Sequence, residues 1–328
     1  MRLDGGGQMQ FGSYDLEQLV SKDHALRKIN RVIDFTELTK ELSDLETDTG
    51  RKGYGAEFAV RSMFLQFLND FSDRQMKQHL QDNFAFRWFC GLSLNDETPA
   101  HSYFGRMRAT IGTKRIGKIF ENIKTQAKGM GHLRGVFTFV DATTIKAKEA
   151  TWKERDQALE KGEKKLNNDN VQKYSADKDA RFGCKGNEKF WFGYKRSVAL
   201  DMGCGLITKV AVTPANVPDW EALKHVVPKE GMVFGDKAYG IKPARLTIEA
   251  NGCVSGAILK NNVKDKDFRR DKWLTKIRMP FEGVFSKRQR RSRYRGQAKN
   301  QLQGFMESIV FNVRRLVVLQ TPPMLARA

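Results

Sequence analysis

The spacing of apolar residues changes near residue 130, and this change constrains the fold of the 328-residue chain more than any other feature. Before that point, apolar residues recur every three or four positions, as in GAEFAVRSMFLQFLNDF at 55–71, which predicts amphipathic helices. After it, GVFTFVDATT at 135–144 alternates apolar and polar residues, which is typical of a strand. We therefore expect a helical region over 1–130 and a mixed α/β region over 131–328.

The helical region contains several signals for where helices begin. Ser72 and Gln75 form the pattern of a capping box, and apolar residues then recur at four-residue spacing up to Gly91, which predicts one helix. Within 96–112, Thr98 stands in the N-cap position and Pro99 in the first helical position of a further helix.

Arg106 and Arg108 lie off the apolar face of that helix, and another helix is expected over 114–129. Two helices joined by a turn that contains glycine fit a helix-turn-helix DNA-binding motif, in which these arginines would contact DNA. Plain packing of helices explains the same pattern equally well.

The second region is expected to contain a mixed sheet. Its predicted strands, two of which form a hairpin around MGCG, are 135–144, 190–201, 205–214, 231–236 and 252–260. Its predicted helices are 219–227, 242–250 and two C-terminal helices, of which the last, 298–319, has a strong apolar stripe. The charged segment 146–189 has almost no apolar periodicity and is interpreted as a long, partly helical surface loop.

The charge of the chain points to nucleic acid as its partner. It carries 58 Lys and Arg residues against 38 Asp and Glu residues, a net charge of +20 at pH 7, which suits phosphate binding. No apolar run is long enough to span a bilayer, and no signal peptide or lipidation motif is present, so we expect a cytosolic, nucleoid-associated protein. The four cysteines and five histidines do not have the spacing of a zinc site.

Two acidic residues stand at the ends of apolar strands, Asp141 in FTFVDATT and Asp236 in VFGDKAYG. A carboxylate buried beside apolar neighbours needs compensation, and Mg²⁺ provides it because it prefers hard oxygen ligands. Glu282, which follows Pro280 at the expected start of a helix, completes a set of three metal ligands. The alternatives are turn or N-cap roles for the two aspartates and an ion pair with a neighbouring arginine for Glu282.

Lys and Arg dominate the segment 287–299, which contains no Asp or Glu. Its arginines suit phosphate oxygens and its tyrosine can stack on a base or sugar, whereas the alternative is a solvated basic face. The candidate DNA-contacting residues here are Lys287, Arg288, Arg290, Arg293, Tyr294 and Arg295.

Three residues between Asp141 and Asp236 also need a reading. Lys195 is expected on a strand next to Asp141, where it either reaches a phosphate or remains a surface lysine. Asp219 in TPANVPDW is interpreted as a helix cap, and Asn216 as a loop residue that could line the site.

The order of VDATT, VFGDKAYG and RMPFEGVF, followed by RYRG and a long helix, resembles the DDE transposases of bacterial insertion sequences. The resemblance is greatest to the insertion-sequence-five group within the four/five superfamily. It covers most of the chain and also includes MFLQFLNDFSDRQMKQHL, FRWFCGL, FGYK and TPANVPD.

This resemblance implies a ribonuclease-H-like core, with Asp141 on the first strand, Asp236 after the fourth and Glu282 on a following helix. Because Glu282 comes 282 − 236 = 46 residues after Asp236, there is no room for the large β insertion of some relatives. Of the signature around the family's Glu, Arg278 matches and is a further candidate for DNA contact. Thr275 and Gln289 depart from it, and Trp273 or the basic residues after Glu282 are the candidates to substitute.

The resemblance further implies two Mg²⁺ ions, which Mn²⁺ would replace, and a homodimer acting on double-stranded DNA at transposon ends and target sites. The expected activity is cleavage of a strand at the transposon end by two-metal hydrolysis, followed by transfer of the 3′-hydroxyl end into target DNA. The alternatives are a ribonuclease-H-like nuclease without strand transfer and a non-catalytic helix-turn-helix regulator.

Overall fold

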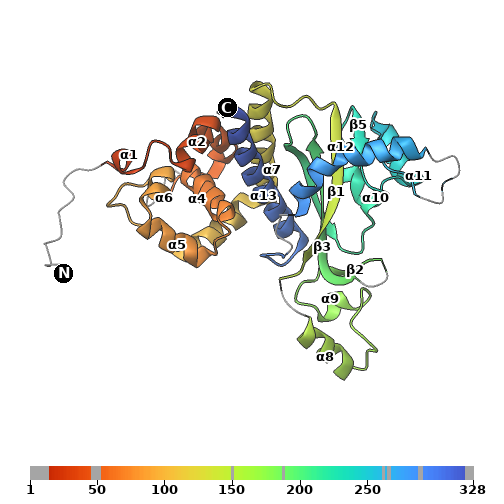
Figure 1. The fold of residues 1–328 in the computed structure, drawn as a ribbon. Helices are drawn as coiled ribbons and strands as arrows, with labels where there is room; N and C mark the ends of the chain where they lie inside the picture. The colour runs from red at the N-terminus through yellow and green to blue at the C-terminus, as the bar shows by residue number, and fades with distance from the viewer. Residues whose placement is uncertain are drawn as a thin grey trace, which may run out of the picture. The chain divides into compact units, whose positions relative to one another are not determined.

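The computed structural model describes residues 15–45, 53–148, 151–186, 189–260, 263, 267–286 and 291–321 (Figure 1). The chain forms two compact units, Met1–Ile111 and Gly112–Ala328. The point of division lies inside helix α7 (His101–Gly129), where Gly112 has a non-helical backbone with φ of 67°.

The first unit is helical, as the apolar spacing predicts. Phe35 packs edge to face against Phe64 and Phe89 in its core, with ring centroids 5.7 Å apart for Phe35–Phe64 and 5.3 Å apart for Phe35–Phe89. The described elements, besides the first part of α7, are α1 (Leu16–Leu19), α2 (Ala25–Val32), α3 (Phe35–Thr39), the 3₁₀ helix η1 (Lys40–Leu45), α4 (Ala56–Leu68), α5 (Asp73–Asp82) and α6 (Phe84–Phe89).

The helix boundaries confirm one expectation and correct two. The capping box of Ser72 and Gln75 is present at the start of α5. The single helix expected to run to Gly91 is two helices, because the Asn83 side chain accepts a hydrogen bond from the Phe86 backbone N–H at 3.1 Å and so starts α6. Helix α7 begins at His101 rather than at Pro99.

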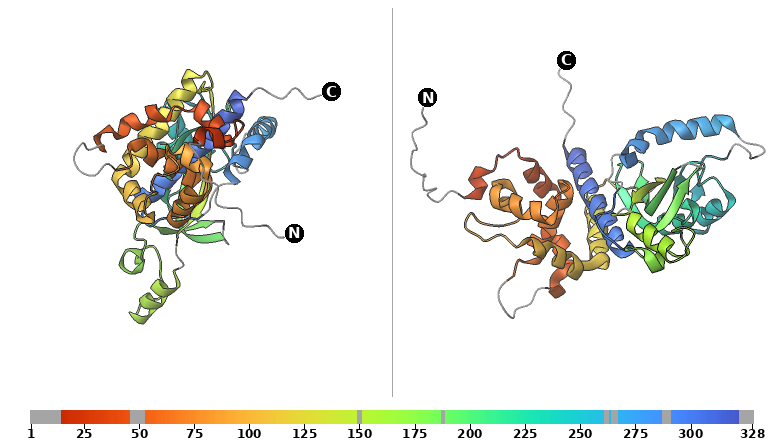
Figure 2. Two further views of the ribbon diagram at one scale, coloured as in Figure 1. Left: turned by 90° about the vertical axis from the view of Figure 1, so that its left-hand side faces the viewer. Right: turned by 90° about the horizontal axis from the view of Figure 1, so that it is seen from below.

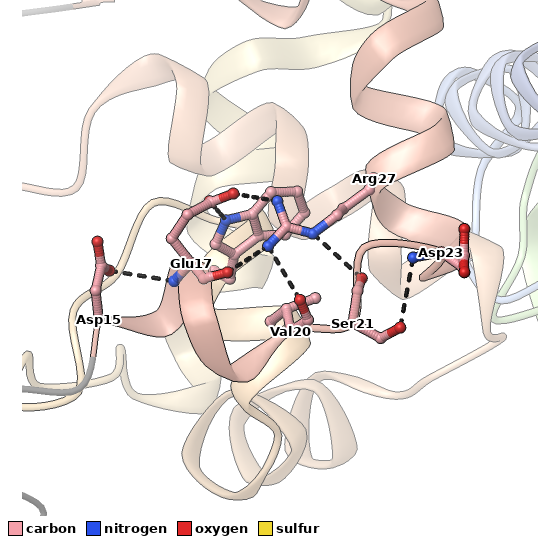
Figure 3. Close-up of polar contacts among 7 residues, drawn as sticks. Asp15, Glu17, Val20, Ser21, Asp23 and Arg27 are labelled. Carbon is pink, nitrogen blue, oxygen red and sulfur yellow. Dashed lines mark hydrogen bonds and ion pairs between the residues drawn. The ribbon is translucent and has the colours of Figure 1, made fainter.

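A half-buried arginine, Arg27, holds the first turns of this unit together (Figure 3). The Arg27 guanidinium donates hydrogen bonds to the carbonyls of Val20 at 3.0 Å and Ser21 at 3.2 Å, and it forms an ion pair with Glu17. It also lies 4.5 Å from the ring centre of Trp88, whose indole N–H donates to Glu17. The arginine thus fastens α1 and the turn before α2 to α6.

The second unit is built on a mixed sheet with the strand order β2-β3-β1-β5-β6, and β4 also pairs with β3. β1 pairs antiparallel with β3 and parallel with β5. The strands are β1 (Phe137–Lys146), β2 (Arg181–Lys185), β3 (Lys189–Asp201), β4 (Ile207–Pro214), β5 (Met232–Phe234) and β6 (Val254–Ser255). The hairpin of β3 and β4 is confirmed, whereas the strand expected over 252–260 is only two residues long.

The charged segment between β1 and β3 is more ordered than a loop. It contains α8 (Trp152–Glu160), α9 (Val171–Tyr174) and β2, with a small apolar cluster of Ala158, Leu166 and Val171. Asp236 therefore follows the fifth strand in chain order rather than the fourth.

Helices cover both faces of the sheet. Val140 belongs to the core shared with α11 (Lys242–Ala250) and the short turns α10 (Asp219–Ala222) and η2 (Leu223–His225). Its neighbour Phe139 faces the other side, towards α12 (Phe268–Ser286), which runs across β1 in Figures 1 and 2. Helix α12 continues through Pro280, so the expectation that a helix starts after this proline is wrong.

The last helix, α13 (Gln297–Gln320), packs on β4. Its Gln301 side chain hydrogen-bonds the backbone of Val210 and Val212 on that strand. The fully buried Arg196 of β3 forms an ion pair with Glu307 of the same helix. Among the helices that the structure describes, none is long and apolar enough to cross a membrane.

Candidate active site

Strand register brings Asp141 and Asp236 to the same end of the sheet. In the parallel pair of β1 and β5, Phe139 lies opposite Phe234. Asp141 comes two residues after Phe139, and Asp236 comes two residues after Phe234. The two carboxylates therefore occupy equivalent positions on neighbouring strands, beyond the point where β5 ends.

The turn after β5 fixes the position of Asp236. One oxygen of its carboxylate accepts a hydrogen bond from the Ala238 N–H at 2.8 Å, and its carbonyl accepts one from the Tyr239 N–H at 3.1 Å. Gly235 is needed here, because a Cβ at this position would lie 2.7 Å from the Tyr239 ring. The tight turn thus places both Asp236 and Tyr239 next to the end of β1.

Asp141 lies in a strongly perturbed environment. Burial raises its pKa from 3.8 to about 6, although a hydrogen bond from the Ala142 N–H at 2.8 Å opposes this rise. The negative charge of Asp236 raises the pKa further, and that of Asp219 adds to it. The Lys185 ammonium acts in the opposite direction. Three carboxylates and one lysine thus share one local electrostatic environment.

Asp219, the third of these carboxylates, forms an ion pair with Lys195. The Lys195 ammonium donates to the Asp219 carboxylate at 2.9 Å and to the Val217 carbonyl at 3.0 Å. The side chain of Lys195 is only 14% exposed, so its ammonium group is largely shielded from solvent. The expected capping role of Asp219 is wrong, because Pro218 occupies the N-cap position of α10 and Asp219 is the first helical residue. The expectation that Lys195 lies on a strand next to Asp141 is confirmed by the pairing of β1 with β3.

Tyr239 is a site neighbour that sequence reasoning missed. Its side chain is 1% exposed, and its hydroxyl has no hydrogen-bond partner in the part of the chain that the structure describes. Burial raises its pKa well above the usual value, and the charges of Asp219, Asp141 and Asp236 raise it further. The available signal was its place in GDKAYG, three residues after Asp236.

Helix α12 reaches this end of the sheet from the other side. The rings of Phe281 and Phe139 lie 6.5 Å apart, and the Arg278 guanidinium lies 6.0 Å from the centre of the Phe139 ring. Glu282 follows Phe281 directly and has a helical backbone, but its side chain lies outside the described residues. Its role as a third carboxylate remains a prediction.

The arginines of the first unit differ in their surroundings. Arg106 is exposed. The Arg108 guanidinium donates to both oxygens of Asp73, at 2.8 and 2.6 Å, and to the Gln66 side chain at 2.9 Å. Because these bonds occupy its guanidinium and its side chain is only 11% exposed, Arg108 is better explained as a structural residue.

The basic segment after Glu282 is described only in part. Burial lowers the pKa of Arg293, which is half-buried like Tyr294, whereas Arg295 is exposed. The candidates that lie outside the described residues are Lys287, Arg288 and Arg290.

The described acids fit a divalent cation, although they do not form a complete site. Among the described residues there is no group of three or more His, Cys, Asp or Glu side chains that could hold a metal ion. Asp141 and Asp236 nevertheless supply hard oxygen atoms, and burial together with the charge of Asp236 raises the pKa of Asp141, a penalty on its ionised form that a cation would offset. The Lys195 ion pair already compensates Asp219.

Comparison with known proteins gives the family. Residues 14–110 match the model "Transposase domain (DUF772)", and residues 133–312 match the model "Transposase DDE domain". A comparison with curated proteins found no match.

The solved structures found to be similar include two transposase complexes. One is the piggyBac transposase synaptic complex with hairpin DNA, at 9% identity and a TM-score of 0.37, covering 94% of this chain and 82% of that chain. The other is the Mos1 transposase paired-end complex with the left transposon end, at 9% identity and a TM-score of 0.18, covering 93% and 90%. Because the DDE domain model alone matches more than half of the sequence, the chain belongs to the DDE transposases, and its two matched domains are those of an insertion-sequence transposase of the four/five-like kind.

Proposed function

We propose that this transposase belongs to the insertion-sequence-five group and cuts DNA with Asp141, Asp236 and Glu282. The observation that carries the proposal is the equivalent position of the two aspartates on the neighbouring parallel strands β1 and β5. Helix α12 adds support, because Phe281 contacts Phe139 of β1 and Glu282 is the next residue. The three motifs thus converge on one end of the sheet.

The sheet also supports a ribonuclease-H-like core. When β2, which belongs to the charged segment, is set aside, Asp141 lies on the first strand and Asp236 follows the fourth, as the resemblance implies. A helical DNA-binding region over 1–130 would precede the catalytic domain over 131–328.

Asp141, Asp236 and Glu282 would hold two Mg²⁺ ions, and Mn²⁺ would substitute. Bound there, the ions would supply compensation of negative charge at the scissile phosphate and at the attacking and leaving oxygens. Asp141 and Asp236 are suited to this role because backbone N–H groups orient their oxygens, at 2.8 Å in each case. The protein itself supplies positioning and charge, and no covalent bond forms between protein and DNA.

The substrate is double-stranded DNA at the transposon ends and at the target, handled by a homodimer. The net charge of +20 supports this, because it favours phosphate binding with release of counterions. Arg278 is a described candidate on α12, and its guanidinium lies 6.0 Å from the centre of the Phe139 ring, two residues before Asp141. Arg106 and Arg295 are exposed and are further candidates for contact with phosphates.

The test is nicking of a supercoiled plasmid that carries the element's ends, with Mg²⁺ present. Asp141→Ala, Asp236→Ala and Glu282→Gln are each expected to abolish nicking while leaving binding to end DNA largely intact. Asp169→Ala is the matched control, because Asp169 is an exposed acid of the same unit. Full nicking by any one of the three variants would overturn the assignment.

A second assay separates transposition from simple nuclease activity. A pre-cut end is mixed with a supercoiled target, and joined products are measured. A transposase joins the two DNA molecules, whereas a nuclease that lacks strand transfer leaves the target unjoined.

A further inference from the structure

Helix α12 turns one side to the sheet and the other to solvent. Asp271 and Leu274 are buried, and the Phe281 ring contacts Phe139 of β1, so these residues mark the inner side of the helix. Figure 2 shows α12 at the surface of the second unit in both views. The residues on the opposite side of the helix therefore face away from β1.

This solvent side carries a row of cations. Arg269, Lys272 and Lys276 are exposed, and their spacing of three and then four residues places them one above another along the helix. The row is about 10 Å long, at 1.5 Å per residue. The helix has one acid before Phe281, which is Asp271, and it is buried. The row is therefore cationic without an acidic neighbour on its own side of the helix.

Such a row differs from an ordinary solvated helix face. On α8 of the same unit, the exposed residues include both signs of charge, and Arg155 pairs with Asp156 at 3.0 Å. Like charges one turn apart, such as Lys272 and Lys276, repel each other and weaken a helix. In the free protein this arrangement costs stability, whereas a bound polyanion removes the repulsion.

We propose that the row formed by Arg269, Lys272 and Lys276 binds the phosphate backbone of duplex DNA, on the side of α12 that faces away from β1. Phosphates of one strand follow each other every 3.4 Å along the duplex axis, so a row of about 10 Å covers about three of them. Contacts to phosphates position DNA without reading its sequence. The surface therefore holds duplex DNA whatever its sequence, and the inference rests on the proposed function in taking DNA as the partner.

A protein partner fits this face less well. Trp273, which is 56% exposed, lies next to the row, and tryptophan is common at protein interfaces, but lysine is depleted there. A second copy of this chain carries a net charge of +20, so it is repelled by a cationic row. The charge of the row thus favours a polyanion.

The test measures the salt dependence of DNA binding without cleavage. Two fluorescein-labelled duplexes, one of random sequence and one with the element's end sequence, are titrated by anisotropy in EDTA at several salt concentrations. The variant with Arg269→Gln, Lys272→Gln and Lys276→Gln should reduce the slope of log K against log salt by about 2.7 on both duplexes, at about 0.9 per lost phosphate contact. Its melting temperature should not fall, because the three side chains are exposed.

The matched control removes the same three charges from another helix. Lys153→Gln, Arg155→Gln and Lys161→Gln together take one arginine and two lysines from exposed positions at α8. Because this control lowers the net charge equally, it separates contact at α12 from the overall attraction of DNA to a cationic protein. Its slope should stay near that of wild type. Equal slopes for the two glutamine variants, or a loss confined to the end duplex, would overturn the inference.

A charge-preserving variant separates charge from folding. Arg269→Lys, Lys272→Arg and Lys276→Arg together keep the row cationic, so this variant should bind both duplexes with the slope of wild type. A slope as low as that of the glutamine variant would mean that the row does not act through its charge, and would count against the proposal.

Plasmid nicking with Mg²⁺ distinguishes this inference from the proposed function. If wild type fails to nick end DNA, the proposed function fails, while the salt dependence in EDTA still tests the surface. If wild type nicks and the glutamine variant of α12 keeps the wild-type slope, only the DNA-binding role of the row fails.

Discussion

Replacing Asp141 by Asn should stabilise the metal-free protein while abolishing cleavage. The substitution removes a buried charge but keeps an oxygen that can accept the Ala142 N–H. The pKa of Asp141 rises from 3.8 to about 6 in the folded protein, so the folded state holds the proton more tightly than the unfolded state. Ionisation of Asp141 therefore lowers the free energy of unfolding. This loss of stability grows as the pH rises from 3.8 to about 6, and it stays constant at higher pH.

The size of the effect follows from that shift. A rise of about 2 pKa units corresponds to about 3 kcal/mol of unfolding free energy at pH 8, at about 1.4 kcal/mol per unit. At pH 4.5 the same relation gives a destabilisation of only about 1 kcal/mol, because the carboxyl is protonated in the folded protein and mostly ionised in the unfolded protein. Because Asp141 is partly exposed, solvent screening places the measured gain at pH 8 nearer to about 2 kcal/mol.

Chemical unfolding in EDTA at pH 8 and pH 4.5 measures this gain. Asp141→Asn should be more stable than wild type at pH 8, and the difference should shrink at pH 4.5. Added Mg²⁺ should stabilise wild type more than the variant, because the variant has lost a ligand. Asp169→Asn, which changes an exposed carboxylate, should behave as wild type. A variant that is no more stable than wild type at pH 8 would refute the argument that Asp141 carries an uncompensated buried charge.

Three further substitutions test contacts that stabilise the fold. Glu307→Ala should lower the unfolding free energy by about 3–5 kcal/mol, measured by chemical unfolding, because it leaves the Arg196 guanidinium buried without its carboxylate. Ser72→Ala should lower it by about 1 kcal/mol through loss of the capping box, with no effect on nicking if the first helices stay folded. Gly183→Ala should reduce nicking and melting temperature together, since the new methyl group meets the Ala215 carbonyl, and a fully active variant would contradict the packing of β2 against Ala215.

The sequence predicts those parts of the fold that depend on local patterns. Apolar spacing locates α4 and α13, and the turn MGCG locates the hairpin of β3 and β4. β2 is missed because its partner is β3 and its own residues are charged and glycine-containing, so that pairing, not propensity, makes it a strand. The break at Asn83 is missed because apolar spacing continues through it, although the side chain of Asn83 caps a new helix.

The candidate site is predictable to the same extent. Asp141 and Asp236 are found because each ends an apolar strand, and the parallel register then makes them neighbours. Asp219 looks like a cap in sequence, yet its carboxylate, at the start of α10, is bound by Lys195 of β3, 24 positions earlier in the chain.

The site therefore contains two kinds of carboxylate. Asp219 has an ammonium at 2.9 Å, so the chain itself compensates its charge. Asp141 and Asp236 accept backbone N–H groups, which orient a carboxylate but do not neutralise it, and the pKa of Asp141 remains raised. Composition cannot distinguish these two kinds, and the proposal that Asp141 and Asp236 rather than Asp219 bind the metal rests on this difference.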